Sequence, residues 1–232
     1  MSNELIAIIP CYDVSRYCED VICDIIPLVS HLIAIDDGST DKTGKILQNL
    51  AQEHPRKLTV ITFPENRGKG YALIAGFKYA LDHFKFKAIV TIDADGQHQA
   101  KDIERLARAI FQGAEMAIGT RSFRQMPWKS RTGNLITSFL LSCLYSQAPV
   151  DTQSGLRAFS QNLAQEIAQK IPGGHYEMEY KCLLLALKQK RKIEEIPIHT
   201  IYIDKNVSSH FRAWNDSVKV IRSLFNHLFG LQ

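Results

Sequence analysis

The first half of the chain alternates between unbroken apolar runs and amphipathic stretches. The apolar runs have the length and β-branched composition of buried strands, and they occupy residues 5–9, 31–35, 58–63 and 88–92. In the stretches between them, apolar residues recur every three or four positions, as on one face of a helix. Strands that alternate with helices predict a mostly parallel sheet with crossover helices, so we expect a single-domain α/β fold.

Two element boundaries follow from local chemistry. We expect Pro10 to end the first strand, because proline has no N–H to donate to a ladder. We expect Ser39 or Thr40 to cap the helix after the second strand, because a side-chain hydroxyl accepts bonds from the free N–H groups at a helix start.

The second half of the chain is less regular. It predicts helices at 100–112, 134–145 and 176–187, strands at 116–120 and 193–203, and a loop at 151–159 that leads into a short strand. The apolar residues at 217–231 form one stripe beside basic residues, as in a helix that either docks on the core or lies on a membrane surface. We therefore expect a domain at 1–212, with 213–232 as an amphipathic helix of that domain or of the membrane surface.

Polar motifs follow three of the predicted strands. They read PCYD after the first strand, DDGSTD after the second and DADGQH after the fourth. The carboxyl ends of parallel strands meet at one edge of a sheet, and ligands gather there. We therefore expect these three motifs to converge in space.

Two carboxylates, Asp93 and Asp95, directly follow the fourth strand. Along an extended chain the period of two residues places both on one side, within reach of one ion. Carboxylate oxygens suit Mg²⁺ or Mn²⁺, which keep part of their coordination shell for water and substrate phosphates. The motif therefore predicts a metal site for a diphosphate, and the competing hypothesis is an acidic turn on a solvated edge.

Composition narrows the class of partner. A chain of 232 residues with 45% hydrophobic residues can bury a sizeable core, and its net charge of +4 suits anionic substrates or an anionic membrane surface. No basic stripe typical of nucleic-acid binding is present, so we expect no nucleic-acid partner.

The five cysteines lack metal-ligand spacing and are expected to be free thiols. The longest apolar span, 135–145, is too short to cross about 30 Å of hydrocarbon, so we expect a soluble or peripheral protein.

Six segments taken in order are more informative than any one of them: PCYD, DDGSTD, NRGKGYA, DADGQH, GTRS and DTQSGLRAF. Together they resemble the family 2 inverting glycosyltransferases with the GT-A fold, most closely the branch that transfers sugars to dolichyl or polyprenyl phosphate. The resemblance implies a nucleotide-sugar donor (GDP-mannose or a UDP-sugar), Mg²⁺ or Mn²⁺, and a lipid phosphate acceptor. It also implies an enzyme on the cytoplasmic face of a membrane, held there by the C-terminal helix or by a membrane subunit.

The resemblance also implies roles for individual residues. The donor contacts would be Pro10, Tyr12, Asp37, Lys69 and Asp93, and the metal and diphosphate ligands Asp93, Asp95 and Gln97. The acceptor side would include Arg131, Ser154, Arg157, Ser209 and Arg212, and the catalytic set Asp95, Arg121, Arg131 and Asp151. One departure concerns the donor base: the family commonly has Tyr-Asn-Glu after the first strand, and this chain has Tyr12-Asp13-Val14.

Several residues of these motifs have a competing role. Asp36 and Asp37 would serve to cap the next helix, Lys69 to face solvent, and Asp151 to form a turn. A lipid monophosphate has a second pKa of about 6, so it is largely a dianion at pH 7 and needs no strong base to attack. Its attack in one step would invert the configuration at the anomeric carbon of the sugar. A hydroxyl acceptor would need a base, for which Asp151 or Glu177 is the candidate.

Two further hypotheses concern the function of the whole chain. One is a sugar-nucleotide pyrophosphorylase, which should carry a glycine-rich triphosphate loop near its N-terminus, and PCYD is no such loop. The second is a catalytically silent nucleotide- or lipid-binding module that retains the fold. The presence of Asp93, Asp95, Arg121 and Arg131 favours an enzyme over such a module.

Overall fold

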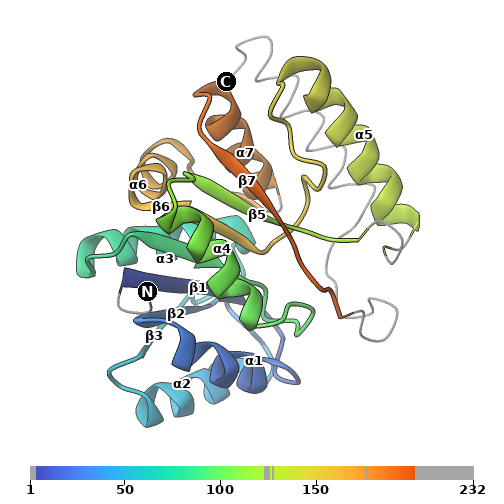
Figure 1. Ribbon diagram of the computed structural model, residues 1–232. Helices are drawn as coiled ribbons and strands as arrows, with labels where there is room; N and C mark the ends of the chain where they lie inside the picture. The colour runs from blue at the N-terminus through green and yellow to red at the C-terminus, as the bar shows by residue number, and fades with distance from the viewer. Residues whose placement is uncertain (1–3, 123–125, 127, 176, 202–232) are drawn as a thin grey trace.

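The computed structural model describes residues 4–122, 126, 128–175 and 177–201. Within them, one seven-stranded sheet has the order β3-β2-β1-β4-β6-β5-β7 (Figure 1). The strands are β1 (Leu5–Cys11), β2 (His31–Asp36), β3 (Leu58–Thr62), β4 (Ala88–Thr91), β5 (Met116–Thr120), β6 (Arg157–Ser160) and β7 (Ile193–Pro197). Only β6 runs antiparallel to its neighbours β4 and β5, so the predicted mostly parallel sheet is confirmed.

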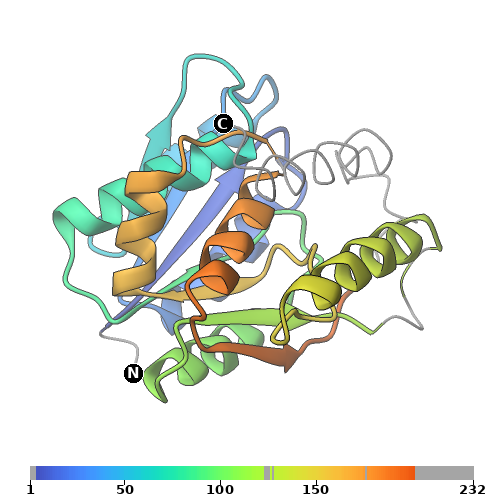
Figure 2. The ribbon, with the colours of Figure 1, turned by 90° about the horizontal axis from the view of Figure 1, so that it is seen from above.

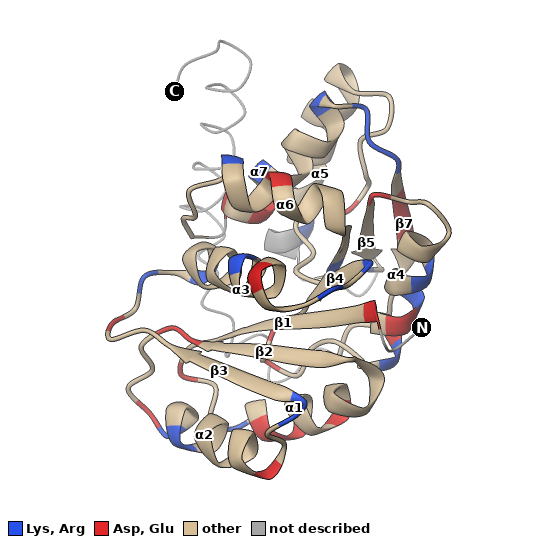
Figure 3. Ribbon diagram, turned by 90° about the vertical axis from the view of Figure 1, so that its left-hand side faces the viewer, with Lys and Arg blue, Asp and Glu red and all other residues tan. Residues whose placement is uncertain are grey.

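Helices cover both faces of the sheet (Figure 2). They are α1 (Cys18–Ile25), the short 3-10 helix η2 (Ile26–Leu28), α2 (Thr43–Glu53), α3 (Lys69–His83), α4 (Lys101–Phe111), α5 (Trp128–Leu144), α6 (Gln161–Lys170) and α7 (Glu177–Lys188). One core packs under α3, α6 and α7, and the other under α1, α2 and α4. Alternate residues of β1 enter the two cores, which is why its sequence is apolar without a break. Figure 3 accordingly shows β1, β2 and β3 almost free of charged residues along their lengths.

β1 continues through Pro10 to Cys11, so the prediction that Pro10 ends the strand is wrong. The backbone of Cys11 faces β2, where its carbonyl accepts the Asp37 N–H at 2.8 Å. Because successive residues of a strand face opposite neighbours, Pro10 faces β4, which ends at Thr91. No ladder bond is required there, and the missing N–H of proline costs nothing.

α2 begins at Thr43, so the expectation that Ser39 or Thr40 caps it is wrong. Both residues bond instead to the loop after β1. The Ser39 hydroxyl accepts the Asp13 N–H at 3.1 Å, and the Thr40 N–H donates to the Asp13 carboxylate at 2.8 Å. The Asp41 carboxylate accepts the N–H of Thr43 at 2.8 Å. The DDGSTD segment therefore joins two loops at the sheet edge.

The second half departs further from expectation. α5 begins at Trp128, before the expected start at residue 134, and β7 ends at Pro197. α6 was not predicted, although Ser160 marks its start by accepting the N–H of Leu163 at 3.2 Å. The expected helix at 217–231 lies outside the described residues, so the proposed role of 213–232 stays a prediction. No helix in the described ranges is long and apolar enough to cross a bilayer.

Candidate active site

Backbone bonds bring the carboxyl ends of the central strands together, as the motif positions predict. The Ile92 N–H donates to the carbonyl of Ile8 at 3.1 Å and so joins the end of β4 to β1. Asp37 binds the loop before α3, because its two carboxylate oxygens accept the N–H groups of Arg67 at 2.8 Å and Gly68 at 2.9 Å. Asp37 therefore shapes this loop rather than capping α2, and its contact with a donor stays a prediction.

Lys69 lies between two carboxylates. Its Nζ atom is 2.5 Å from Asp93 Oδ1 and 2.7 Å from Glu179 Oε1. Burial opposes the charge on Lys69, but the two carboxylates outweigh burial and raise its pKa. Burial likewise opposes the charge on Asp93, and Lys69 outweighs it and holds the pKa of Asp93 low. The hypothesis of a solvated lysine is therefore wrong: this is a fixed cation beside the first aspartate of the DAD motif.

Asp95 lies in a turn, where its Oδ1 atom accepts the N–H of Gln97 at 3.1 Å. The expected extended geometry is therefore wrong, yet the two aspartates still interact electrostatically. Burial and the charge of Asp93 raise the pKa of Asp95 to about 6. A divalent cation between such carboxylates relieves their repulsion, so the donor set fits Mg²⁺ or Mn²⁺. No group of three or more His, Cys, Asp or Glu side chains in the described ranges forms a metal site by itself.

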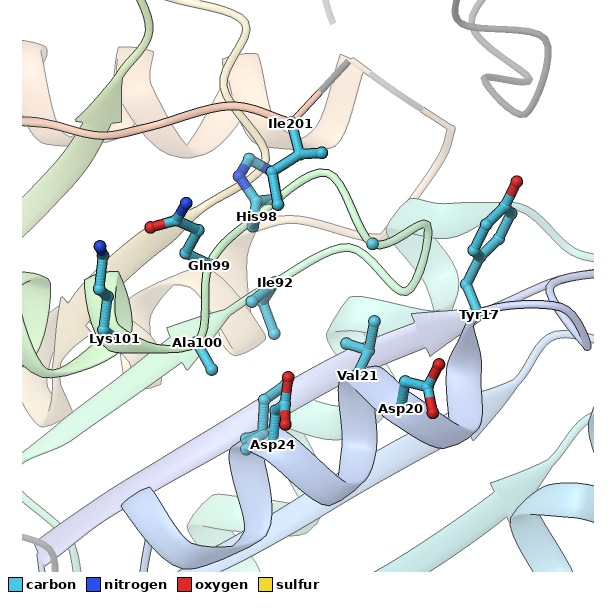
Figure 4. Close-up of a pocket in the computed structure, with 12 residues that line it drawn as sticks. Tyr17, Asp20, Val21, Asp24, Ile92, His98, Gln99, Ala100, Lys101 and Ile201 are labelled. Atoms are coloured by element: carbon cyan, nitrogen blue, oxygen red, sulfur yellow. The ribbon is translucent and has the colours of Figure 1, made fainter. Parts of the chain in front are cut away.

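His98 closes the other side of this cluster. Its Nε2 atom lies 3.9 Å from Asp93 Oδ2, and burial lowers its pKa to about 4, so the ring is neutral at pH 7. A pocket of about 500 Å³ lies behind the DADGQH loop, between α1 and the start of α4 (Figure 4). His98 and Gln99 line it opposite Asp20 and Asp24. This pocket lies beside the metal motif and shares Gly96 with it.

Arg121, directly after β5, forms a two-pronged ion pair with Asp151. Its Nε atom is 2.7 Å from Oδ2 and its Nη2 atom 2.9 Å from Oδ1, and its backbone N–H also donates to Oδ2. Asn134 Nδ2 and the Gln153 N–H donate to the same carboxylate. Asp151 is fully buried, and although burial opposes its charge, Arg121 lowers its pKa. A carboxylate so occupied is a poor proton acceptor, so the structure favours Asp151 as the anchor of Arg121 over Asp151 as a base.

Arg157 occupies a different place from the one its motif implied. It is 0% exposed, and its guanidinium donates to three backbone carbonyls, those of Thr152 at 2.7 Å, Ser154 at 2.8 Å and Glu179 at 2.5 Å. We therefore correct its assignment from an acceptor contact to a residue that shapes the 151–157 loop. Ser154 is also buried, and its hydroxyl has no hydrogen-bond partner among the described residues.

The 151–157 loop lies directly against the DAD motif at Gly155. A Cβ added to Gly155 would lie 2.3 Å from Asp93 Oδ2 and 3.0 Å from Lys69 Nζ. The Gly155 carbonyl accepts the hydroxyl of Thr91 at 3.2 Å, which fixes the loop to the end of β4. The predicted acceptor side and the predicted metal side are thus in contact, and only a residue without a side chain fits between them.

We expect Gly155→Ala to lower both stability and activity. Atoms at 2.3 Å overlap, so Asp93 must shift, and strain of this kind costs typically about 1–3 kcal/mol. The measurement is the thermal unfolding midpoint in a double-mutant cycle with Asp93→Ala. Gly155→Ala should cost less stability once the Asp93 carboxylate is gone, and an equal cost in both backgrounds would contradict the contact.

The remaining expected site residues lie as follows. Pro10 and Tyr12 are partly buried at the end of β1, and Arg131 is exposed on the first turns of α5. Ser209 and Arg212 lie outside the described residues. Glu179 was missed as a site residue, because its only sequence signal was an acidic position near the start of α7.

The chain is similar to several known proteins. A family model described as "Glycosyl transferase family 2" matches residues 6–173. A UDP-N-acetylglucosamine–dolichyl-phosphate N-acetylglucosaminyltransferase of Methanococcus voltae is 33% identical over 230 residues, which cover 90% of this chain and 90% of that protein. A polyprenol monophosphomannose synthase of Mycolicibacterium smegmatis is 30% identical over 178 residues, which cover 72% of this chain and 65% of that protein.

A solved structure has the same fold. Glucosyl-3-phosphoglycerate synthase of Mycobacterium tuberculosis, crystallised with Mn²⁺, UDP and phosphoglyceric acid, matches with a TM-score of 0.71 and 18% sequence identity. The match covers 94% of this chain and 77% of that one. At this identity the likeness establishes the architecture of the sheet and its helices.

Proposed function

The chain belongs to glycosyl transferase family 2 and has the GT-A fold, and from this we propose that it transfers a sugar from a nucleotide-sugar donor to a polyprenyl or dolichyl phosphate. The acceptor class is supported by the names of two relatives, a dolichyl-phosphate N-acetylglucosaminyltransferase and a polyprenol monophosphomannose synthase. The observation that carries the proposal is the contact between the Lys69–Asp93 cluster and the 151–157 loop at Gly155. This contact supports the proposal, because a donor bound at the cluster would lie next to an acceptor bound at the loop.

We assign the metal site to Asp93, Asp95 and Gln97, with Mg²⁺ or Mn²⁺ as the ion. The raised pKa of Asp95 supports this assignment, because it reflects two carboxylates that repel each other. A divalent ion bound there would supply charge neutralisation for the diphosphate leaving group. Lys69 keeps Asp93 ionised, and the Gln97 N–H holds one oxygen of Asp95 in place.

The chain's own residues would then bind and orient the reactants. Asp151 holds the planar Arg121 guanidinium in one orientation, and arginine suits two-pronged phosphate binding. Three acid–base groups near the cluster are poor bases, because Asp151 is saturated with donors, Glu179 is paired with Lys69, and His98 has a pKa of about 4. Asp95 is assigned to the metal, and a role of Glu177 as base stays a prediction. This arrangement favours an acceptor that is already an anion, such as a lipid phosphate, which would attack in a single inverting step.

The proposal places the chain at a membrane surface on its cytoplasmic side, where a lipid phosphate is reached from the aqueous phase. The amphipathic sequence at 213–232 and the exposed Arg131 are the features that support this location. The proposal includes a membrane subunit as a second means of holding the chain at the membrane. It also includes a GDP- or UDP-sugar as the donor.

Metal affinity is expected to depend on pH through Asp95. Because its pKa is about 6 in the metal-free protein, Asp95 is protonated below pH 6, and a metal ion must displace that proton. The affinity for Mn²⁺ should therefore be constant above pH 7 and fall toward about tenfold per pH unit below pH 6. Calorimetric titration at pH 5.0, 5.5, 6.0 and 7.5 measures it. Equal affinity at pH 5.0 and 7.5 would contradict the assignment of Asp95 as a ligand.

Nucleotide-dependent thermal unfolding tests the donor half of the proposal. The protein is heated with UDP, GDP, dTDP or ADP, each with and without Mn²⁺, as wild type and as Asp95→Asn. A ligand that binds only the folded state, at about 100 times its Kd, stabilises it by about 2.7 kcal/mol and should raise the midpoint by about 5–10 °C. We expect that shift for one nucleotide, only with Mn²⁺, and not in the variant. No shift with any nucleotide would refute the transferase mechanism.

A further inference from the structure

One side of α5 carries apolar side chains exposed to solvent. Leu135, Ile136 and Phe139 are 47%, 55% and 68% exposed. Phe139 is four residues after Leu135 and three after Ile136, so it neighbours both on one side of the helix, and we call these three residues the α5 face. α5 lies at the margin of the molecule in both Figure 1 and Figure 2. Large apolar side chains gathered in this way on a surface mark an interaction site.

The opposite side of α5 is firmly held. Asn134 Oδ1 accepts the Thr152 N–H at 2.9 Å, and the hydroxyls of Thr137 and Thr152 lie 2.8 Å apart. Leu141 is fully buried in the core under α3 and α7. The exposure of the α5 face is therefore not the result of a loosely packed helix, because the same helix is bonded to the 151–157 loop and packed into the core.

The charges of α5 narrow the kind of partner. Its 17 residues contain no Asp or Glu, and Arg131 near its start is exposed. A helix that exposes apolar side chains and positive charge, but no negative charge, complements a surface with negatively charged headgroups over an apolar interior. An anionic lipid bilayer has this chemistry.

We propose that the α5 face docks on an anionic lipid bilayer; the purpose of this docking rests on the proposed lipid phosphate acceptor. Asn134 binds Asp151 at 2.9 Å, and Asp151 binds Arg121. A helix with its side chains is about 10–12 Å across. A bilayer in contact with the α5 face would therefore lie about one helix diameter from the loop that holds Arg121, so the phosphate of a membrane lipid reaches the site while its chain stays in the bilayer.

Vesicle binding by the full-length protein tests the proposal. The probe is co-sedimentation with phosphatidylcholine vesicles that contain phosphatidylglycerol, and the variant is Ile136→Ser with Phe139→Ser. The matched control is Ile136→Leu with Phe139→Leu, which keeps both side chains apolar. We expect the serine variant to bind vesicles at least about tenfold more weakly and the leucine variant to bind as wild type does.

Three results of the binding, oligomer and stability measurements would overturn the proposal. Equal vesicle binding by wild type and the serine variant would show that the α5 face does not dock. A wild-type dimer that the serine variant converts to monomer, measured by light scattering without vesicles, would show an interface between copies of the chain. A thermal unfolding midpoint clearly lower in the serine variant than in the leucine variant would show that the rest of the chain covers the face.

An activity measurement separates this proposal from the proposed function. With a short, water-soluble prenyl phosphate as acceptor, the serine variant should keep wild-type activity, whereas transfer to long-chain polyprenyl phosphate in vesicles should fall with vesicle binding. If wild type transfers sugar to neither acceptor, the proposed function fails, while vesicle binding still decides whether the α5 face docks. Loss of activity toward the soluble acceptor in the serine variant alone would overturn docking as the role of the face.

Discussion

Asp95→Asn is expected to lower the rate of sugar transfer by at least about 10²–10³-fold and, in the metal-free protein, to raise thermal stability above pH 6. The loss of rate follows because the variant removes a ligand of the ion proposed to stabilise the leaving group, and such groups contribute several kcal/mol. The gain in stability follows from the pKa of Asp95, which the fold raises from 3.8 to about 6.

The sign of the stability change depends on pH. A carboxyl group whose pKa is raised by folding is harder to ionise in the folded state than in the unfolded one. Its destabilising contribution is absent below the unfolded pKa of 3.8, grows as pH rises, and is complete above about 6. The variant should therefore gain most at pH 7.5 and progressively less toward pH 4.5, as measured by thermal unfolding in EDTA.

A matched control for this variant is Asp82→Asn. Asp82 is an exposed carboxylate near the end of α3, 13 residues and therefore about 20 Å along the helix from Lys69. Asp82→Asn should change neither the transfer rate nor the unfolding midpoint, since substitutions of exposed residues usually change the free energy of unfolding by less than about 0.5 kcal/mol. If Asp95→Asn kept full activity in Mn²⁺, Asp95 would not be a metal ligand that sugar transfer requires.

Arg157→Leu is expected to destabilise the fold by about 3–5 kcal/mol. The buried guanidinium donates to three backbone carbonyls, and leucine removes all three of these bonds. For a chain of this size that loss lowers the unfolding midpoint by about 6–20 °C. Denaturant or thermal unfolding of both proteins measures it.

Arg131→Leu is the comparison variant, because Arg131 is exposed on α5 and its side chain makes no hydrogen bond within the described residues. It should leave the unfolding midpoint unchanged and raise the KM for the acceptor. The two arginines were given related roles from their motifs, and the structure separates them by burial. If Arg157→Leu kept wild-type stability and raised only the acceptor KM, Arg157 would be an acceptor contact after all.

The parallel half of the sheet was predictable because its strands are buried on both faces. Residues such as Ile8 and Ile9 enter opposite cores, so the strands appear in the sequence as unbroken apolar runs. The order of the motifs then placed three loops at one edge of the sheet. A short strand was expected at the end of the 151–159 loop, and β6 is that strand, but its antiparallel pairing depends on tertiary contacts and was not foreseen. α6 was not predicted at all.

The site itself was predictable in its composition but not in its connections. Lys69 and Glu179 are 110 residues apart in sequence, and no spacing rule reveals their ion pair. Asp151 and Arg157 stand in one motif, yet one binds an arginine at the site and the other binds backbone carbonyls inside the core. Which way a polar side chain faces is set by the packing around it, and a motif does not contain that information.

Analysis of the reaction product tests the transfer of a sugar to a lipid phosphate. The direct measurement supplies the full-length protein with Mn²⁺, the nucleotide sugar identified by thermal unfolding, and polyprenyl phosphate in anionic vesicles, and then analyses the extracted lipid by mass spectrometry and NMR. We predict polyprenyl phosphate carrying one sugar, with the anomeric configuration opposite to that of the donor, and no such product from Asp95→Asn. Sugar found only on a hydroxyl group, or released only as free sugar, would contradict the account.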